Sequence, residues 1–182
     1  TAEGANTAIV HRGWLGYKAG TAVTASTSNI VLTADAISAG SDITVSTAGQ
    51  FTVKPCNSSF ASVMTWPIPS TLAGRLYALT LSPDVSGLTL GKQGNTADMA
   101  FNADLGVAGP ITVYGGNITA QGLAATDAML TLQGTGNVTL GGNVTANSVR
   151  LVGGNVSFNG STNTIGTLAA SGVGHLSLVN SG

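Results

Sequence analysis

The chain has 182 residues, of which only 7% are charged, and its formal net charge is −1. Helical soluble domains usually carry about a quarter charged residues, so this composition argues against a helical fold. Because 43% of the residues are hydrophobic, the chain also lacks the signature of disorder, and its length predicts one core.

The distribution of charged and apolar residues argues against two classes of partner, nucleic acids and membranes. The basic residues are scattered singly along the chain, so no positive patch favours nucleic acid; they are Arg12, Lys18, Lys54, Arg75, Lys92 and Arg150. No apolar run reaches the 18 or more residues of a membrane helix. We therefore expect neither nucleic-acid binding nor membrane insertion.

The first aromatic cluster lies near the start, in Trp14-Leu15-Gly16-Tyr17. Solenoids need covered ends, so residues 1–19 are interpreted as a segment that packs against one end of a coil. Trp14 and Tyr17 could instead provide a contact platform on which a carbohydrate stacks.

A repeated β-pattern follows in residues 20–54. Residues 22–25 are matched 20 residues later by 42–45, and residues 29–32 are matched 21 residues later by 50–53. Apolar residues alternate with Thr or Ser, which predicts strands with one buried side and one wet side.

The rhythm fails between residues 55 and 86, where four of the five prolines lie. Proline cannot donate to a strand ladder, so this stretch is predicted to leave the coil as a hairpin or a long loop. Strands are then expected at 79–81, 88–90 and 99–101. Cys56, the single cysteine, cannot form an internal disulfide and is interpreted as a small, partly buried side chain; a cross-link between chains is the alternative.

The strongest repeat occupies residues 111–177. A Gly-Asn-Val-Thr-like phrase recurs at Gly116, Gly136, Gly154 and Gly174, at intervals of 20, 18 and 20 residues. A second column begins at Ile111, Leu130, Val149 and Thr167, and a third begins at Leu123, Asn143 and Asn163. Three short strands per period predict an all-β, parallel β-solenoid of about 18–21 residues per turn.

The same periodicity assigns structural roles to particular side chains. The inward ladder is predicted to contain Ile118, Val138, Val156 and Leu176, with Val144 and Ile165 in another ladder. Asparagine after glycine can adopt left-handed turns, and stacked amides can bond from turn to turn. The structural asparagines are predicted to be Asn117, Asn137, Asn143 and Asn155.

No residue pattern predicts catalysis. The only approach to an acidic cluster is Asp98, Asn102 and Asp104, which is better explained by loop capping than by a cation site. No carboxyl pair for glycoside hydrolysis and no nucleophile motif is present. His175 occupies the asparagine slot of the repeat, which indicates a turn position. We therefore expect no enzyme activity, no metal and no cofactor.

The repeats also resemble a known family. Residues 86–92, 94–97 and 108–119, together with Trp14–Tyr17, are similar to the modules of filamentous-haemagglutinin-like adhesins of bacteria, which are two-partner-secreted or autotransported. The resemblance covers most of the chain and implies a right-handed parallel β-helix on the cell surface. Cys56 and the proline-rich stretch fit the repeat least well.

The expected function follows from this resemblance. We expect residues 1–182 to form a single solenoid segment of a longer exported protein that acts in adhesion, cell–cell aggregation or biofilm. Its partner would be a host or cell-surface ligand. The alternative is a self-associating subunit of an extracellular filament or sheath, and a polysaccharide-acting enzyme is a third possibility.

Overall fold

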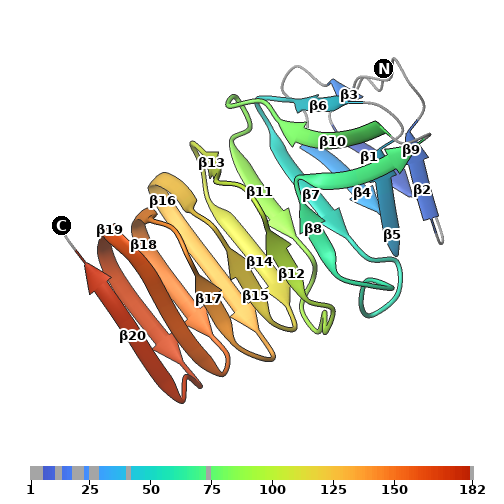
Figure 1. Ribbon diagram of the computed structural model, residues 1–182. Coiled ribbons are helices and arrows are strands. Elements are labelled where there is room, and N and C mark those ends of the chain that lie inside the picture. The colour runs from blue at the N-terminus through green and yellow to red at the C-terminus, as the bar shows by residue number, and fades with distance from the viewer. Residues whose placement is uncertain are drawn as a thin grey trace.

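The chain coils into a parallel β-solenoid in the computed structural model, which describes residues 6–10, 14–17, 23–24, 29–39, 42–72 and 75–180. Successive strands stack along one axis from the N-terminus to β20 (His175–Asn180), as Figure 1 shows. There are about seven turns, and the described residues contain strands and no helix. The predicted fold class is therefore confirmed.

Each turn contributes strands to three faces, which we call the first, second and third face in the order in which the chain visits them. The first face contains β1 (Asn6–Val10), β4 (Asn29–Thr33), β7 (Gln50–Lys54), β11 (Gly87–Leu90), β14 (Ile111–Gly115) and the last residues of β16 (Leu123–Gly134), β18 (Val144–Val152) and β19 (Asn155–Ser171). All its strand pairs are parallel.

The second face continues in register from β8 to β20. It contains β8 (Met64–Trp66), β12 (Met99–Phe101), β15 (Ile118–Ala120), β17 (Val138–Leu140), the start of β19 and β20. Two earlier strands, β2 (Trp14–Tyr17) and β5 (Ala36–Ala39), form a separate parallel pair.

The third face is built in two parts. Towards the N-terminus, β3 (Val23–Thr24), β6 (Ile43–Ser46) and β10 (Arg75–Leu81) pair in parallel, and β9 (Ile68–Leu72) pairs antiparallel with β10. Further along, β13 (Leu105–Val107) pairs with the start of β16, which pairs with the start of β18.

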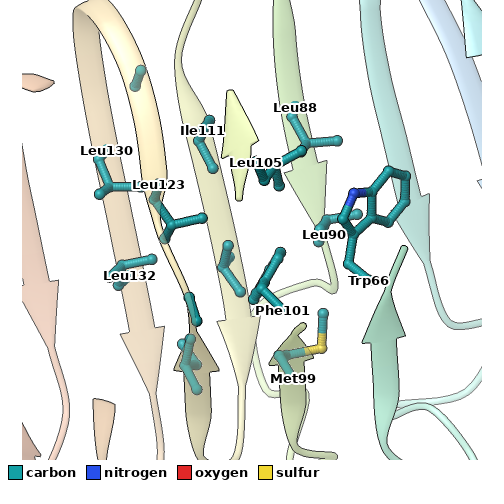
Figure 2. Packing of buried hydrophobic residues seen from close by; sticks show 14 of the residues in the cluster. Trp66, Leu88, Leu90, Met99, Phe101, Leu105, Ile111, Leu123, Leu130 and Leu132 are labelled. Carbon is teal, nitrogen blue, oxygen red and sulfur yellow. The ribbon is translucent and has the colours of Figure 1, made fainter. Parts of the chain in front are cut away.

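The core consists of columns of apolar side chains, one from each turn. Along the first face, one column contains Ile30, Phe51, Leu88, Ile111, Leu130 and Val149, all of which are buried. Figure 2 shows buried side chains of neighbouring strands packing into one continuous interior, with Trp66 beside Leu90 and Phe101. Phe51 and Trp66 also pack together, with ring centroids 6.5 Å apart.

The proline-rich stretch departs from the coil only in part. Its residues Met64–Trp66 form β8 and pair in register with β12, because Pro55 and Pro67 lie outside this strand and remove no ladder donor. The predicted hairpin is present as β9 and β10. Pro69 lies in β9, the outer strand of its sheet, where the missing N–H is tolerated.

Several predicted registers are wrong. On the first face, Val149 pairs with Leu168 and not with Thr167. Val23 pairs with Val45 and not with Ile43; a slip of two residues keeps the same side chains facing inward, so alternation alone cannot detect it. Val144 pairs with Leu123, and Ile165 pairs with Ala146, so Val144 and Ile165 do not share a column.

Candidate interaction surface

The predicted inward ladder on the second face has the expected register. Ile118 pairs with Val138, Val138 with Val156, and Val156 with Leu176. The first three side chains are at most 1% exposed, whereas Leu176 is 38% exposed. Leu176 differs because β20 pairs with β19 alone, so no further described turn covers it.

One aspartate and three asparagines at the edge of this face form a chain of hydrogen bonds. We call this chain the amide row; it contains Asp98, Asn117, Asn137 and Asn155. Each side-chain oxygen accepts the main-chain N–H of the next member. The N···O distances are 2.7 Å from Asn117 to Asp98, 3.0 Å from Asn137 to Asn117 and 3.2 Å from Asn155 to Asn137. The row therefore satisfies corner N–H groups that no strand pairs.

The predicted mode of stacking is only partly right. The amide row runs from side chain to main chain, and an amide-to-side-chain bond is added only where Asn117 Nδ2 donates to Asp98 Oδ1 at 3.1 Å. The prediction that these asparagines adopt a left-handed turn is wrong, because Asp127 is the one described non-glycine residue with a positive φ. The repeated glycines are needed for space: a Cβ on Gly136 would lie 2.5 Å from Asn117 Oδ1.

Asn143 belongs to the corner between the second and third faces. Its Oδ1 accepts the N–H of Thr162 at 3.1 Å, while Asn163 Oδ1 accepts the N–H of Val144 at 2.8 Å. Asn163 is fully buried, and its Nδ2 donates to Gly160 and Val179 carbonyls. A polar side chain thus occupies the column position that Leu123 and Val144 occupy in earlier turns.

A row of hydroxyl side chains runs beside the amide row on the outer side of the second face. This hydroxyl row contains Thr119, Thr139, Ser157 and Ser177, which pair in register. Thr119 and Ser177 are exposed, and Thr139 and Ser157 are half-buried. Thr119, Thr139 and Ser157 each lie two residues after an asparagine of the amide row, so both rows face the same side; Ser177 lies two residues after His175.

Two buried polar residues that sequence reasoning missed close corners nearer the N-terminus. Asn95 Nδ2 donates to the Tyr114 carbonyl at 2.8 Å, and its Oδ1 accepts from Ser59 Oγ and from the N–H of Phe60. Asp35 accepts from the N–H and Nδ2 of Asn57. Neither residue belongs to the repeated phrase, so the sequence carries no periodic signal for them.

The remaining predicted residues are placed as follows. Trp14 and Tyr17 lie in β2 and pair with Ala36 and Ala39. Their side chains are outside the part that the structure describes, so their contact role stays a prediction. Cys56 is half-buried, and its thiol donates to the Thr33 carbonyl at 3.5 Å. Asp98 is used by the amide row, whereas Asn102 and Asp104 are exposed after β12. No group of three potential metal ligands exists among the described residues.

The described surface includes the following two hollows. One of about 130 Å³ lies where β5 and β8 fail to pair and is lined by Asp35, Phe60 and Ser62 among others. The other, of about 410 Å³, is a shallow depression on the third face beside Asp104, Gly122 and Asn143. Neither brings together an acid, a base and a nucleophile.

Comparisons with protein-family models, with curated proteins and with solved structures find no match to this chain. Within the described residues, no helix is long and apolar enough to cross a membrane. The class that the fold defines is a parallel β-solenoid with a regular, hydrogen-bonded corner and a polar outer face.

Proposed function

We propose that this chain is a structural segment of an exported bacterial surface protein and that it acts by contact, in adhesion, cell–cell aggregation or biofilm. The supporting observation is the continuous second face, where six successive turns stack in register from β8 to β20. Such a stack is a stiff rod, because each turn is held by its neighbours. The resemblance of the repeats to adhesin modules supplies the cellular setting.

The outer surface is better suited to binding a partner than to catalysing a reaction. It presents Asn, Thr and Ser side chains in rows, with apolar residues turned inward. A flat polar surface can make many weak hydrogen bonds over a long distance, and their sum gives avidity. On this proposal the chain converts no substrate.

A second candidate function, self-assembly of copies of the chain into a filament, is supported by the composition of residues 167–180, which lie at the end of β19 and in β20. Residues 167–180 contain no Pro, Asp, Glu, Lys or Arg, which are the residues that usually protect strand edges. A second copy that adds to this edge makes a head-to-tail contact, which extends into a filament.

Negative-stain images and adhesion assays on the purified chain test both functions. Monomeric rods that coat cells and cause aggregation support the adhesive segment, whereas concentration-dependent fibres support the filament subunit. Globular particles that neither bind cells nor assemble would contradict both. Measurable cleavage of a polysaccharide would overturn the scaffold proposal.

A further inference from the structure

The outer side of the second face between β12 and β20 is nearly free of charge. Among residues 98–101, 117–120, 137–140, 155–158 and 175–178, Asp98 is the only Asp, Glu, Lys or Arg. The first four of these segments contain no exposed large hydrophobic side chain. An ionic ligand would therefore find few partners here, and a protein partner would find no pocket for the aromatic or aliphatic anchors that dominate protein interfaces.

The amide row gives this face exposed hydrogen-bond donors. Asn137 Oδ1 is held by the N–H of Asn155 at 3.2 Å, which fixes the orientation of the amide. Its Nδ2 group makes no hydrogen bond to another described residue, and the same is true of Asn155 Nδ2. Both residues are exposed, so two N–H₂ groups face solvent from adjacent turns, and that of Asn137 is held in one orientation by its hydrogen bond.

The two rows repeat at the spacing of neighbouring strands, about 4.7–4.9 Å. The donors of the amide row lie beside the hydroxyls of Thr119 and Thr139, which both donate and accept, and beside that of Ser157, which donates to Asn159 Oδ1 at 2.7 Å and is left as an acceptor. A ligand that follows the solenoid axis would meet an amide donor and a hydroxyl at each of the two adjacent turns that carry Asn137 and Asn155. Because the Asn137 amide is already held by a hydrogen bond, ordering this side chain on binding costs little entropy.

We propose that this face binds a neutral, hydroxyl-rich polysaccharide chain lying along the solenoid axis. Hydroxyl and ring oxygens of the glycan accept from Asn137 and Asn155 Nδ2, and its hydroxyls bond to the hydroxyl row. This inference rests on the proposed contact function and names the chemistry of its ligand. The face has no aromatic platform at its exposed positions, so binding of each sugar is weak and affinity grows with the number of sugars.

The test measures binding of neutral β-linked glucan oligosaccharides of two to eight sugars to the full chain, with a sulfated polysaccharide as the anionic comparison. Calorimetry or NMR titration should show affinity that increases with oligosaccharide length. The sulfated polymer should bind no better than a neutral chain of equal length.

Two substitutions test whether the amide row and the hydroxyl row contact the ligand. Asn137→Asp keeps the oxygen that accepts from Asn155 but removes the N–H₂ donors, and Asp98 already performs the acceptor role at an equivalent corner. Thr139→Val removes one hydroxyl while keeping a β-branched side chain. Each should weaken octasaccharide binding about fivefold, since one hydrogen bond is lost. Thr145→Val, an exposed position on the third face, is the control and should bind like the parent.

Several results would overturn the proposal: no binding of any neutral oligosaccharide, tighter binding of the sulfated polymer, or parental affinity in Thr139→Val. Melting curves show whether Asn137→Asp keeps the parental fold, and Thr139→Val decides the matter if it does not. Adhesion that persists when neutral glycans neither bind nor compete would contradict this inference alone and leave the contact function standing.

Discussion

At the scale of the residue, the two members of the repeated Gly-Asn pair have different roles. The asparagine oxygen reaches along the axis to the next turn, and the glycine there leaves room for it. Asn137 N–H donates to Asn117 Oδ1 at 3.0 Å, directly beside Gly136. Any side chain at position 136 would press on the same oxygen, since a Cβ there would lie 2.5 Å from it.

Gly136→Ala should therefore lower the free energy of unfolding by about 1–3 kcal/mol, the usual cost of overpacking. Chemical denaturation measures this cost. Gly141→Ala is the matched control, because a Cβ at position 141 would lie 3.6 Å from the Ala120 carbonyl oxygen, an ordinary contact distance. Alanine also reduces the entropy of the unfolded chain. Equal stability of the two variants would show that the amide row does not constrain position 136.

At the scale of the element, the inward columns bind each strand to the turns on both sides. Val138 is fully buried and pairs with Ile118 and Val156, so a substitution at this position affects the packing of three turns. Thr139, one residue later, faces the opposite side of the same strand. Adjacent residues of β17 therefore allow the buried and outer sides to be compared directly.

Val138→Asp should destabilise the coil by roughly 3–5 kcal/mol, because it buries a charge without a partner. Hydrogen exchange should speed up first in β15, β17 and the start of β19, as expected when neighbouring turns open together. Thr139→Asp, on the outer side, should change stability by only about 0.5 kcal/mol. If Val138→Asp melts like the parent, the side chain does not face the core.

The same columns explain how far the sequence could predict the structure. The period and the alternation identified the solenoid. The column from Ile118 to Leu176 was in register because Ile118, Val138 and Val156 each follow a Gly-Asn pair and Leu176 follows Gly174-His175 in the same position of the repeat. Val144 and Ile165 were misaligned because Asn163, a polar residue, turns inward where the pattern expects an apolar one. β8 was missed because proline density hides a three-residue strand between Pro55 and Pro67. Asn95 and Asp35 act once each and leave no repeat to detect.

At the scale of the whole molecule, the low charge content decides how the solenoid can associate. Only 7% of residues are charged, and the outer side of the second face between β12 and β20 is mostly Asn, Thr and Ser, with Asp98 and Ala100 at one end and His175 at the other. Binding through this face, or through the strand edge at β20, depends on hydrogen bonds and apolar burial. Neither depends strongly on ionic strength.

Self-association or surface binding should therefore persist from low salt to about 1 M salt, where the screening length is about 3 Å. Sedimentation velocity across a salt series measures self-association, and retention on cells or immobilised glycan over the same series measures surface binding. Complete dissociation in 1 M sodium chloride would instead identify charge pairs as the source of binding, and the sparse charged residues such as Asp98 and Arg150 would then be the first positions to substitute.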